Sequence, residues 1–158
     1  MGIFYAYYTS PIGLLEIKTT KDTLLGIKRV ANERYTMIQN DVAALCIAQL
    51  KEYFINQVES FNLPIAFEST ISDFNACVWK ALLTIPLGST CSYKELAVKI
   101  GKPKSARAVG NACSKNPFII VIPCHRVICQ DGRLGGYIAG VEAKKHLLSN
   151  EAKKRLSI

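Results

Sequence analysis

The sequence predicts two small domains: an α/β domain over residues 1–68, and a mainly helical domain with a helix-turn-helix motif over residues 72–158. Segments rich in aromatic and β-branched residues fill the first part of the chain, and short helical patterns with capping residues fill the second. The charge also divides unevenly: residues 1–72 hold six Lys/Arg and seven Asp/Glu, whereas residues 73–158 hold fourteen and five. The net charge of +8 therefore comes from the second half. This balance favours a polyanionic partner, although a solvated basic face would have the same charge.

The first domain is predicted to contain three strands and one helix. The strands are expected at residues 4–8, 14–20 and 24–30, and Ser10-Pro11-Ile12-Gly13 forms the first turn. Asp41 is the expected N-cap of a helix that runs to about residue 54. The apolar residues of this helix fall at roughly helical spacing: Leu45, Ile47, Leu50 and Phe54. The segment 61–70, which contains Pro64, is interpreted as the connection between the domains.

The second domain is predicted to begin with three short helices. Asp73 is expected to cap the first, which reaches about residue 84, and Ser92 to head the second, over residues 93–100. The third spans about residues 105–113, and with the second it forms the helix-turn-helix motif. The apolar run 118–122 is expected to be buried and extended. A glycine-rich loop at 132–140 then leads to a last helix that starts near Val141.

The cysteines and the hydropathy bear on location and metal binding. The six cysteines show no CxxC pair, and there are only two histidines, so the sequence predicts reduced thiols and no metal site. No apolar run approaches the roughly 18–20 residues of a membrane span. The N-terminus lacks the pattern of a secretory signal. We therefore expect a cytoplasmic protein that has no membrane partner.

The third predicted helix is poor in large side chains. Ala106, Ala108 and Gly110 surround a single long side chain, that of Arg107. Small residues allow close approach, either to a protein core or to the groove of a nucleic acid. Four nearby lysines that can neutralise phosphates favour the nucleic acid: Lys99, Lys102, Lys104 and Lys115.

The segment Pro123-Cys124-His125-Arg126 contains the candidate nucleophile. A cysteine beside a histidine and an arginine is in a positive environment, which favours the reactive thiolate. If the segment is a strand, however, neighbouring side chains point to opposite faces. The dipeptide alone is therefore weak support for catalysis.

Several ordered motifs in residues 73–155 resemble the O6-alkylguanine-DNA alkyltransferase family. Ile122-Pro123-Cys124-His125-Arg126-Val127 is similar to the family's active-site signature. Ser92-Tyr93-Lys94 and Ala106-Arg107-Ala108-Val109-Gly110 resemble its helix-turn-helix. Asn116-Pro117, Gly135-Gly136-Tyr137 and the stretch from Leu147 to Glu151 follow in the family's order. Residues 1–72 match only in general character, as an α/β lid domain. The resemblance implies a winged-helix-like second domain.

The resemblance implies a role for each matching residue. Cys124 would accept the alkyl group, His125 would take the thiol proton through a water, and Glu151 would orient the histidine. Tyr93 would donate a hydrogen bond to the departing guanine, and Asn116 would hold the turn before the cysteine. Other residues would line the base pocket: Val127, Tyr137, Ile138 and Ala139.

The resemblance also implies a partner, double-stranded DNA with an alkylated base. The helix with Ala106, Ala108 and Gly110 would lie in the minor groove, Arg107 would replace the extruded base in the stack, and Tyr93 would also contact DNA. The substrate would be O6-alkylguanine, with O4-alkylthymine left open. The reaction would be irreversible, with one turnover per molecule. It would need no cofactor, and we expect a monomer.

The sequence departs from the family pattern at one place, and it leaves three alternatives to the alkyltransferase function open. Ile138-Ala139-Gly140 stands where the family has a small residue and two glycines, so Ala139 is expected to narrow the pocket rim against large alkyl groups. The first alternative is a catalytically weak relative that only flags alkylated bases. The others are a winged-helix transcription factor and a cysteine hydrolase that uses Cys124, His125 and Glu151.

Overall fold

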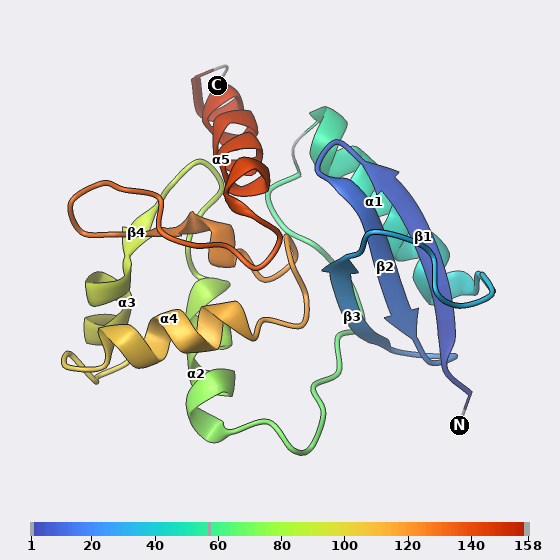
Figure 1. Ribbon diagram of the computed structural model, residues 1–158, viewed down its shortest axis with the longest axis horizontal. Coiled ribbons are helices and arrows are strands. Elements are labelled where there is room, and N and C mark those ends of the chain that lie inside the picture. The colour runs from blue at the N-terminus through green and yellow to red at the C-terminus, as the bar shows by residue number, and fades with distance from the viewer. Residues whose placement is uncertain (1, 57, 157–158) are drawn as a thin grey trace. The chain divides into compact units, whose positions relative to one another are not determined.

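The computed structural model describes residues 2–56 and 58–156 and divides the chain into two compact units, Met1–Ser69 and Thr70–Ile158 (Figure 1). The first unit combines a sheet with a helix, and the second is mainly helical. The predicted fold class, an α/β unit followed by a helical unit with a helix-turn-helix, is confirmed.

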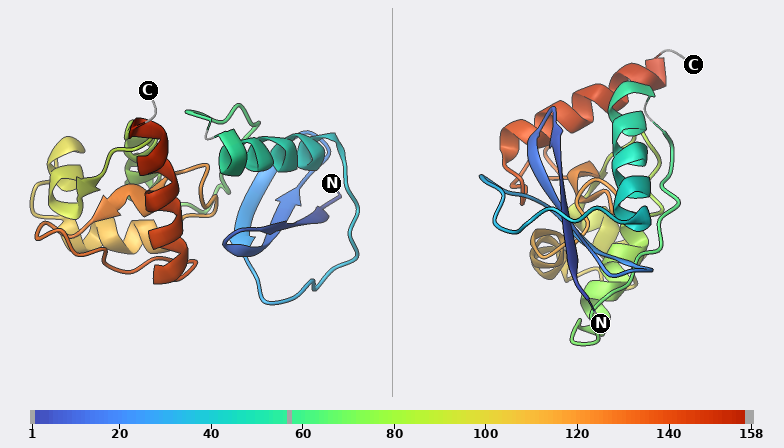
Figure 2. Two further views of the ribbon diagram at one scale, coloured as in Figure 1. Left: turned by 90° about the horizontal axis from the view of Figure 1, so that it is seen from above. Right: turned by 90° about the vertical axis from the view of Figure 1, so that its right-hand side faces the viewer.

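The first unit is an antiparallel sheet covered by one helix. Strands β1 (Phe4–Ser10), β2 (Gly13–Thr19) and β3 (Leu24–Arg29) are ordered β1-β2-β3. Helix α1 (Asp41–Asn56) lies along the sheet, as Figure 2 shows. Gly13 closes the first turn with φ +112°, a value that favours glycine. The core comes from alternate strand residues and one helix face: Ala6, Leu15, Ile17, Ile27, Val42, Cys46, Leu50 and Tyr53.

The beginning and the buried face of α1 differ from the prediction. Asn40, not Asp41, caps the helix, because its Oδ1 accepts from the backbone N–H of Ala43 at 2.9 Å. Asp41 is the first helical residue. Leu45 is 44% exposed, so the stripe that contacts the sheet is shifted toward Val42 and Cys46.

The second unit contains four α-helices and a short two-stranded sheet among its described residues. Its elements are α2 (Asp73–Leu82), β4 (Cys91–Ser92), α3 (Tyr93–Lys99), α4 (Ala106–Ser114), the 3₁₀ helix η1 (Cys124–Arg126), β5 (Val127–Ile128) and α5 (Val141–Leu156). Strands β4 and β5 are parallel, and their pairing places the start of α3 beside the end of η1. The pairing of these two segments, which are distant in the sequence, therefore brings the helix-turn-helix next to Cys124.

The capping residues explain where two of these helices begin. The side chain of Ser92 accepts from the N–H of Glu95, whose carboxylate accepts from the N–H of Ser92. This capping box confirms the predicted start of α3. For α2 the prediction was one residue late, because Ser72 is the cap and Asp73 is the first helical residue.

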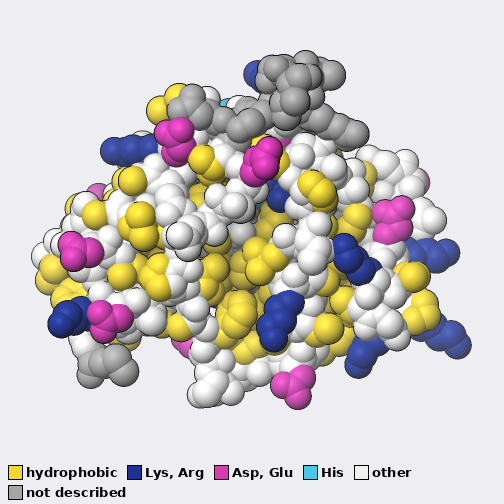
Figure 3. Space-filling view, turned by 180° about the vertical axis from the view of Figure 1, so that it is seen from behind, with side chains coloured by type: hydrophobic (Ala, Val, Ile, Leu, Met, Phe, Trp, Pro, Cys, Tyr) yellow, Lys and Arg dark blue, Asp and Glu magenta, His cyan; other side chains and the backbone are white. Residues whose placement is uncertain are grey.

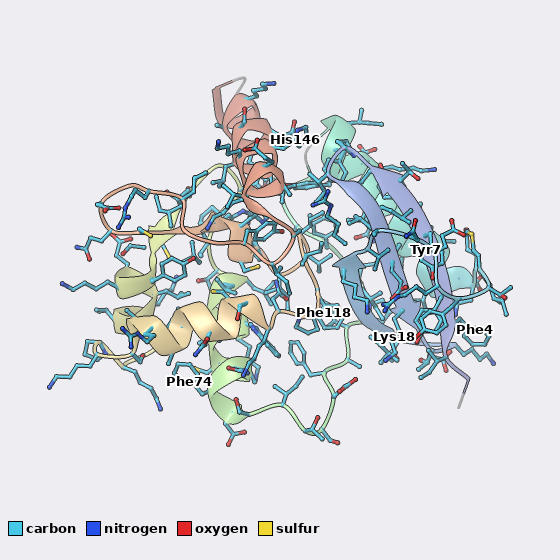
Figure 4. All side chains as sticks on the ribbon, viewed as in Figure 1. Phe4, Tyr7, Lys18, Phe74, Phe118 and His146 are labelled. Carbon is cyan, nitrogen blue, oxygen red and sulfur yellow. The ribbon has the colours of Figure 1, made fainter. Side chains whose placement is uncertain are left out.

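The apolar run 118–122 is buried, as predicted, but it is not extended. Ile122 N–H donates to the carbonyl of Phe118 at 2.9 Å, and Val121 N–H donates to that of Ile119 at 2.8 Å. Ile120 has φ 71°, which is rare for a β-branched residue. Phe118, labelled in Figure 4, is fully buried at the start of this run. The run 118–122, which was expected to be extended, therefore consists of consecutive turns that lead to η1.

The surface of the second unit has many basic side chains. Lys94, Lys99, Lys102, Lys104 and Arg107 are exposed on and between α3 and α4. Figure 3 shows dark blue Lys and Arg side chains on a face of this unit. Within residues 2–56 and 58–156, no helix is long and apolar enough to cross a membrane.

Candidate active site

The second unit contains a cavity of about 260 Å³ between α3, α4, η1 and the glycine-rich loop. Its lining combines one thiol from η1 with aromatic and small residues: Tyr93, Gly110, Cys113, Ser114, Cys124, Gly136, Tyr137 and Ile138. The structure thus places Cys124, Tyr93, Tyr137, Ile138 and Gly110 around one space. This space is large enough for a small planar group.

Asn116 holds Cys124 in place. Its Nδ2 donates to the carbonyl of Ile122 at 2.7 Å and to Sγ of Cys124 at 3.1 Å, while its Oδ1 accepts from Phe118 N–H at 2.9 Å. Asn116 therefore bridges the start and the end of the buried run. Because a donor facing sulfur favours the thiolate, this contact also prepares Cys124 for attack.

The thiol of Cys124 is protonated at neutral pH. Burial raises its pKa to about 11, although the hydrogen bond from Asn116 and the charge of Lys144 act in the opposite direction. A reaction through the thiolate therefore needs a base that removes the proton.

His125 and Glu151 form a buried pair beside Cys124. Nε2 of His125 lies 2.6 Å from Oε1 of Glu151, and both side chains are almost inaccessible to solvent. A carboxylate only accepts hydrogen bonds, so Nε2 carries the proton in this pair. Nδ1 is then the basic nitrogen, and it has no hydrogen-bond partner in the part of the chain that the structure describes.

Arg126 keeps Glu151 charged. Its Nε donates to Oε2 at 2.9 Å and its Nη2 to Oε1 at 3.0 Å, and its Nη1 donates to the carbonyl of Ile85 at 2.7 Å. Burial alone would raise the pKa of Glu151, but the hydrogen bonds and charges of His125 and Arg126 lower it to about 2. Burial lowers the pKa of His125, although Glu151 acts to raise it. The resting pair is therefore a neutral imidazole on a carboxylate.

Tyr93 presents a hydroxyl donor to the cavity. Burial, and then the neighbouring thiols, raise its pKa to about 12, so the hydroxyl remains protonated. Gly135 allows this position, because a Cβ there would lie 3.1 Å from the Tyr93 oxygen, and the backbone has φ +72°. The hydroxyl of Tyr137, which also lines the cavity, has no hydrogen-bond partner among the described residues.

Helix α4 divides into a buried face and an open face. Val109, Ala112 and Cys113 are buried, whereas Arg107 and Ala108 are exposed, and Ala106 and Gly110 are half-buried. One open edge of α4 therefore has small side chains and a single guanidinium, and it adjoins the cavity at Gly110 and Ser114.

Two residues predicted for the pocket do not line the cavity. Val127 is fully buried, and its carbonyl accepts from Lys144. Ala139 is 5% exposed and lies behind the rim, whereas its neighbour Ile138 is 47% exposed and lines the cavity. The rim is therefore formed by Ile138. The second histidine, His146, lies on the exposed side of α5 (Figure 4).

The sequence patterns did not indicate a role for Lys144 or Cys113 in the site. Arg126 was expected only to contribute to the positive environment of Cys124, and its bonds to Glu151 were not foreseen. The available signal was helical spacing, because Lys144 lies three and seven residues before Leu147 and Glu151, on one face of α5. No group of three metal-binding side chains occurs among the described residues.

Both units match known families. Residues 3–67 match the family described as "6-O-methylguanine DNA methyltransferase, ribonuclease-like domain". Residues 73–153 match the family described as "6-O-methylguanine DNA methyltransferase, DNA binding domain". A methylated-DNA–protein-cysteine methyltransferase of Methanosarcina barkeri is 43% identical over 155 residues, covering 94% of this chain and 97% of the relative. The protein of the same name from Mycobacterium tuberculosis is 41% identical, covering 94% and 92%.

Solved structures are similar over nearly the whole chain. The crystal structure of Mycobacterium tuberculosis OGT in complex with DNA superposes with a TM-score of 0.87 at 37% identity, covering 96% of this chain and 94% of the other. The O6-methylguanine-DNA methyltransferase of Pyrococcus kodakaraensis superposes with a TM-score of 0.72 at 25% identity, covering 95% and 99%.

Proposed function

This chain belongs to the 6-O-methylguanine DNA methyltransferase family, and from that membership we propose that Cys124 is the residue that accepts the alkyl group. The protein repairs DNA directly, by moving a methyl group from an alkylated guanine to one of its own cysteines. The observation that supports Cys124 is its place in the cavity, where Asn116 contacts its sulfur and the His125–Glu151 pair lies beside it.

The first step is removal of the thiol proton. Nδ1 of His125 takes the proton through a bridging water, and the resulting imidazolium is stabilised by Glu151, which Arg126 holds as a carboxylate. Glu151 is a positioning residue, because it acts through the histidine. The base is needed because the thiol of Cys124 has a pKa of about 11.

In the second step the thiolate attacks the alkyl carbon in line with the bond to O6. The S–C bond forms, the C–O6 bond breaks, and the electron pair remains on the guanine. The hydroxyl of Tyr93 donates a hydrogen bond to the departing base, which accounts for a proton donor in the lining of the cavity. Proton return from His125 then leaves neutral guanine.

The protein binds alkylated DNA through its second unit. We place the open edge of α4 in the minor groove, because Ala106, Ala108 and Gly110 permit close approach there. The target nucleotide is flipped out of the helix, since a buried sulfur cannot reach O6 within the stack, and Arg107 fills the vacated position.

The thioether product has no easy leaving route, so each molecule acts once. The substrate supplies its own alkyl group, and the proposed reaction therefore uses no cofactor. We propose a monomer that acts in the cytoplasm, where its six free cysteines remain reduced. A protein that only flags damage would not need a thiol in the cavity next to a buried histidine–carboxylate pair.

The test is the location of the methyl group. The protein is incubated with excess O6-methylguanine duplex and digested, and the peptides are analysed by mass spectrometry. We expect one added methylene, on Cys124 only, and one repair event per molecule. Cys124→Ala should bind DNA and transfer nothing, whereas the control Cys129→Ala should transfer normally. Methylation of another cysteine, or repeated turnover, would contradict the proposal.

A further inference from the structure

The cavity contains two thiols, those of Cys113 and Cys124, and the proposed alkyl transfer uses only one of them. Cys113 lies in the last turn of α4 and Cys124 at the start of η1, and both residues are buried. Three lining residues are exposed and form the mouth of the cavity: Ser114, Gly136 and Ile138. A small molecule that enters the cavity therefore meets both thiols in the same space.

Asn116 joins the two segments that carry these thiols. Its backbone N–H donates to the carbonyl of Cys113 at 3.2 Å, and its Nδ2 donates to Sγ of Cys124 at 3.1 Å. One residue thus fixes the end of α4 relative to η1. The two thiols also influence each other. Burial raises the pKa of Cys113 to about 12, and the next cause of this rise is Cys124, as expected for neighbouring groups that would carry the same charge.

The remaining cysteines do not line the cavity. Cys129, five residues after Cys124 in the sequence, is half-buried outside it. Three more cysteines lie on α1, α2 and β4: Cys46, Cys77 and Cys91. Within residues 2–56 and 58–156, Cys113 is therefore the one thiol that shares the cavity with Cys124.

The environments of the two thiols decide which of them reacts first. The pKa of Cys124 is about 11 and that of Cys113 about 12, so the thiolate of Cys124 is about tenfold more abundant at neutral pH. Cys124 also receives the hydrogen bond from Asn116 and has the His125–Glu151 pair beside it. Cys124 is therefore the attacking thiol, and Cys113 is the thiol that follows it.

We propose that Cys113 and Cys124 form a thiol–disulfide exchange site, at which a low-molecular-weight disulfide converts the pair to an intramolecular disulfide and so reversibly blocks the alkyl acceptor. This inference rests on the proposed role of Cys124 as the nucleophile. It adds a second partner for that thiol and assigns a function to Cys113.

Two exchange steps account for all atoms and electrons. The thiolate of Cys124, whose proton has passed to His125, attacks one sulfur of the small disulfide. The S–S bond of that molecule breaks, and the first small thiol leaves with the proton. Cys113 then attacks the sulfur of Cys124, the mixed disulfide breaks, and the second small thiol leaves with the proton of Cys113. The two protein thiols are oxidised, and the small disulfide is reduced.

The disulfide differs from the alkylated product because it can be reversed. A dithiol reduces the pair by the same two exchange steps, whereas the thioether is permanent. The pair therefore stays reduced while small thiols predominate, and it closes when the proportion of small disulfide rises. An acceptor that works only once is preserved in the closed form.

The test uses the full chain without DNA, and the probe is bis(2-hydroxyethyl) disulfide. Free thiols are then blocked with N-ethylmaleimide, and unreduced peptides are mapped by mass spectrometry. Cys113→Ser and Cys124→Ser each remove one member of the pair. Cys129→Ser is the matched control, because its thiol lies outside the cavity. Methyl transfer is measured for each protein relative to its own untreated sample.

The parent protein and Cys129→Ser should form the disulfide between Cys113 and Cys124 and retain no hydroxyethyl group. Cys113→Ser should stop at a mixed disulfide on Cys124. In Cys124→Ser, Cys113 should react about tenfold more slowly than Cys124 does in the parent, because its pKa is one unit higher. Methyl transfer by the oxidised parent should be lost and should return with dithiothreitol.

Three results would each overturn the proposal: a mixed disulfide that persists on Cys124 in the parent, a disulfide between Cys124 and Cys129, and no modification of the folded protein. If Cys113→Ser does not fold, the peptide map of the parent decides, because it identifies the joined pair directly. A methyl group on another cysteine would refute Cys124 as the alkyl acceptor without changing this map. Methylation of Cys124 in a protein that never forms the disulfide would refute only the present inference.

Discussion

Oε1 of Glu151 and Nε2 of His125 lie 2.6 Å apart, although 26 residues separate them in the sequence. The pair joins α5 to η1 inside the second unit. Arg126 holds the same carboxylate by two hydrogen bonds, so the histidine that follows Cys124 has a fixed orientation and a defined basic nitrogen.

Glu151→Gln should slow methyl transfer about a hundredfold at neutral pH, because the imidazolium that forms during proton removal loses its counter-charge. The rate should recover partly as the pH is raised, since hydroxide then replaces the base. Single-turnover repair between pH 7 and 10 measures this. Glu142→Gln, at an exposed position of the same helix, is the control. A loss of rate that is equal at every pH would exclude a role in proton removal.

The same pair should make the second unit sensitive to acid. The pKa of Glu151 falls from 4.5 to about 2 on folding, so its stabilisation is complete above pH 4.5 and is lost as the pH falls toward 2. Such a shift corresponds to about 3 kcal/mol in the free energy of unfolding. His125 has a lowered pKa, so stability also decreases below its ordinary value of 6.5.

Trp79, the single tryptophan, is buried in α2 and reports the unfolding of this unit. Urea denaturation followed by its fluorescence should give a steep loss of stability between pH 6 and 3. A flat profile over that range would contradict the expected protonation states.

Asn116→Ala should affect both structure and reactivity. It removes the acceptor of the buried Phe118 N–H, which costs about 1–3 kcal/mol in the free energy of unfolding, whereas the carbonyl of Ile122 still accepts from the N–H of Cys124. It also removes the donor to Sγ of Cys124, so iodoacetamide should label this thiol more slowly. Unchanged labelling in a folded variant would show that the contact with sulfur is only structural. Asn111→Ala, at an exposed position on α4, is the control.

Arg107→Ala should slow repair of duplex DNA about tenfold more than repair of single-stranded DNA, because a single strand has little stack to hold open. Lys104→Ala, which removes an exposed cation near α4, should weaken both substrates alike. Single-turnover rates on both substrates make the comparison. Equal losses for Arg107→Ala would remove its base-replacement role.

Ile138, and not Ala139, is expected to limit the entry of large groups into the cavity. Ile138→Ala should raise the rate with free O6-benzylguanine about tenfold and leave methyl transfer nearly unchanged, because Ile138 lines the cavity and its bulk limits larger groups. Ala139→Gly should have little effect on either reaction. If Ala139→Gly alone increases the benzyl reaction, the residue behind the rim controls access.

The sequence by itself determined those features that depend on neighbours along the chain. Ser92 and Glu95 are three residues apart, so their reciprocal capping bonds, and with them the start of α3, follow from local geometry. The order of strands and helices and the signature around Cys124 are local in the same sense. These features were enough to predict the fold class, the family and the reaction.

Only the tertiary structure decided which distant groups meet. The run 118–122 becomes a series of turns because Asn116 bonds to both of its ends, and Lys144 and Arg126 become part of the site because α5 packs against η1. Spacing along the chain does not specify such contacts, since each depends on how separate elements pack. A buried charge is stable only where several distant segments together supply its partners, and that arrangement exists only in the folded chain.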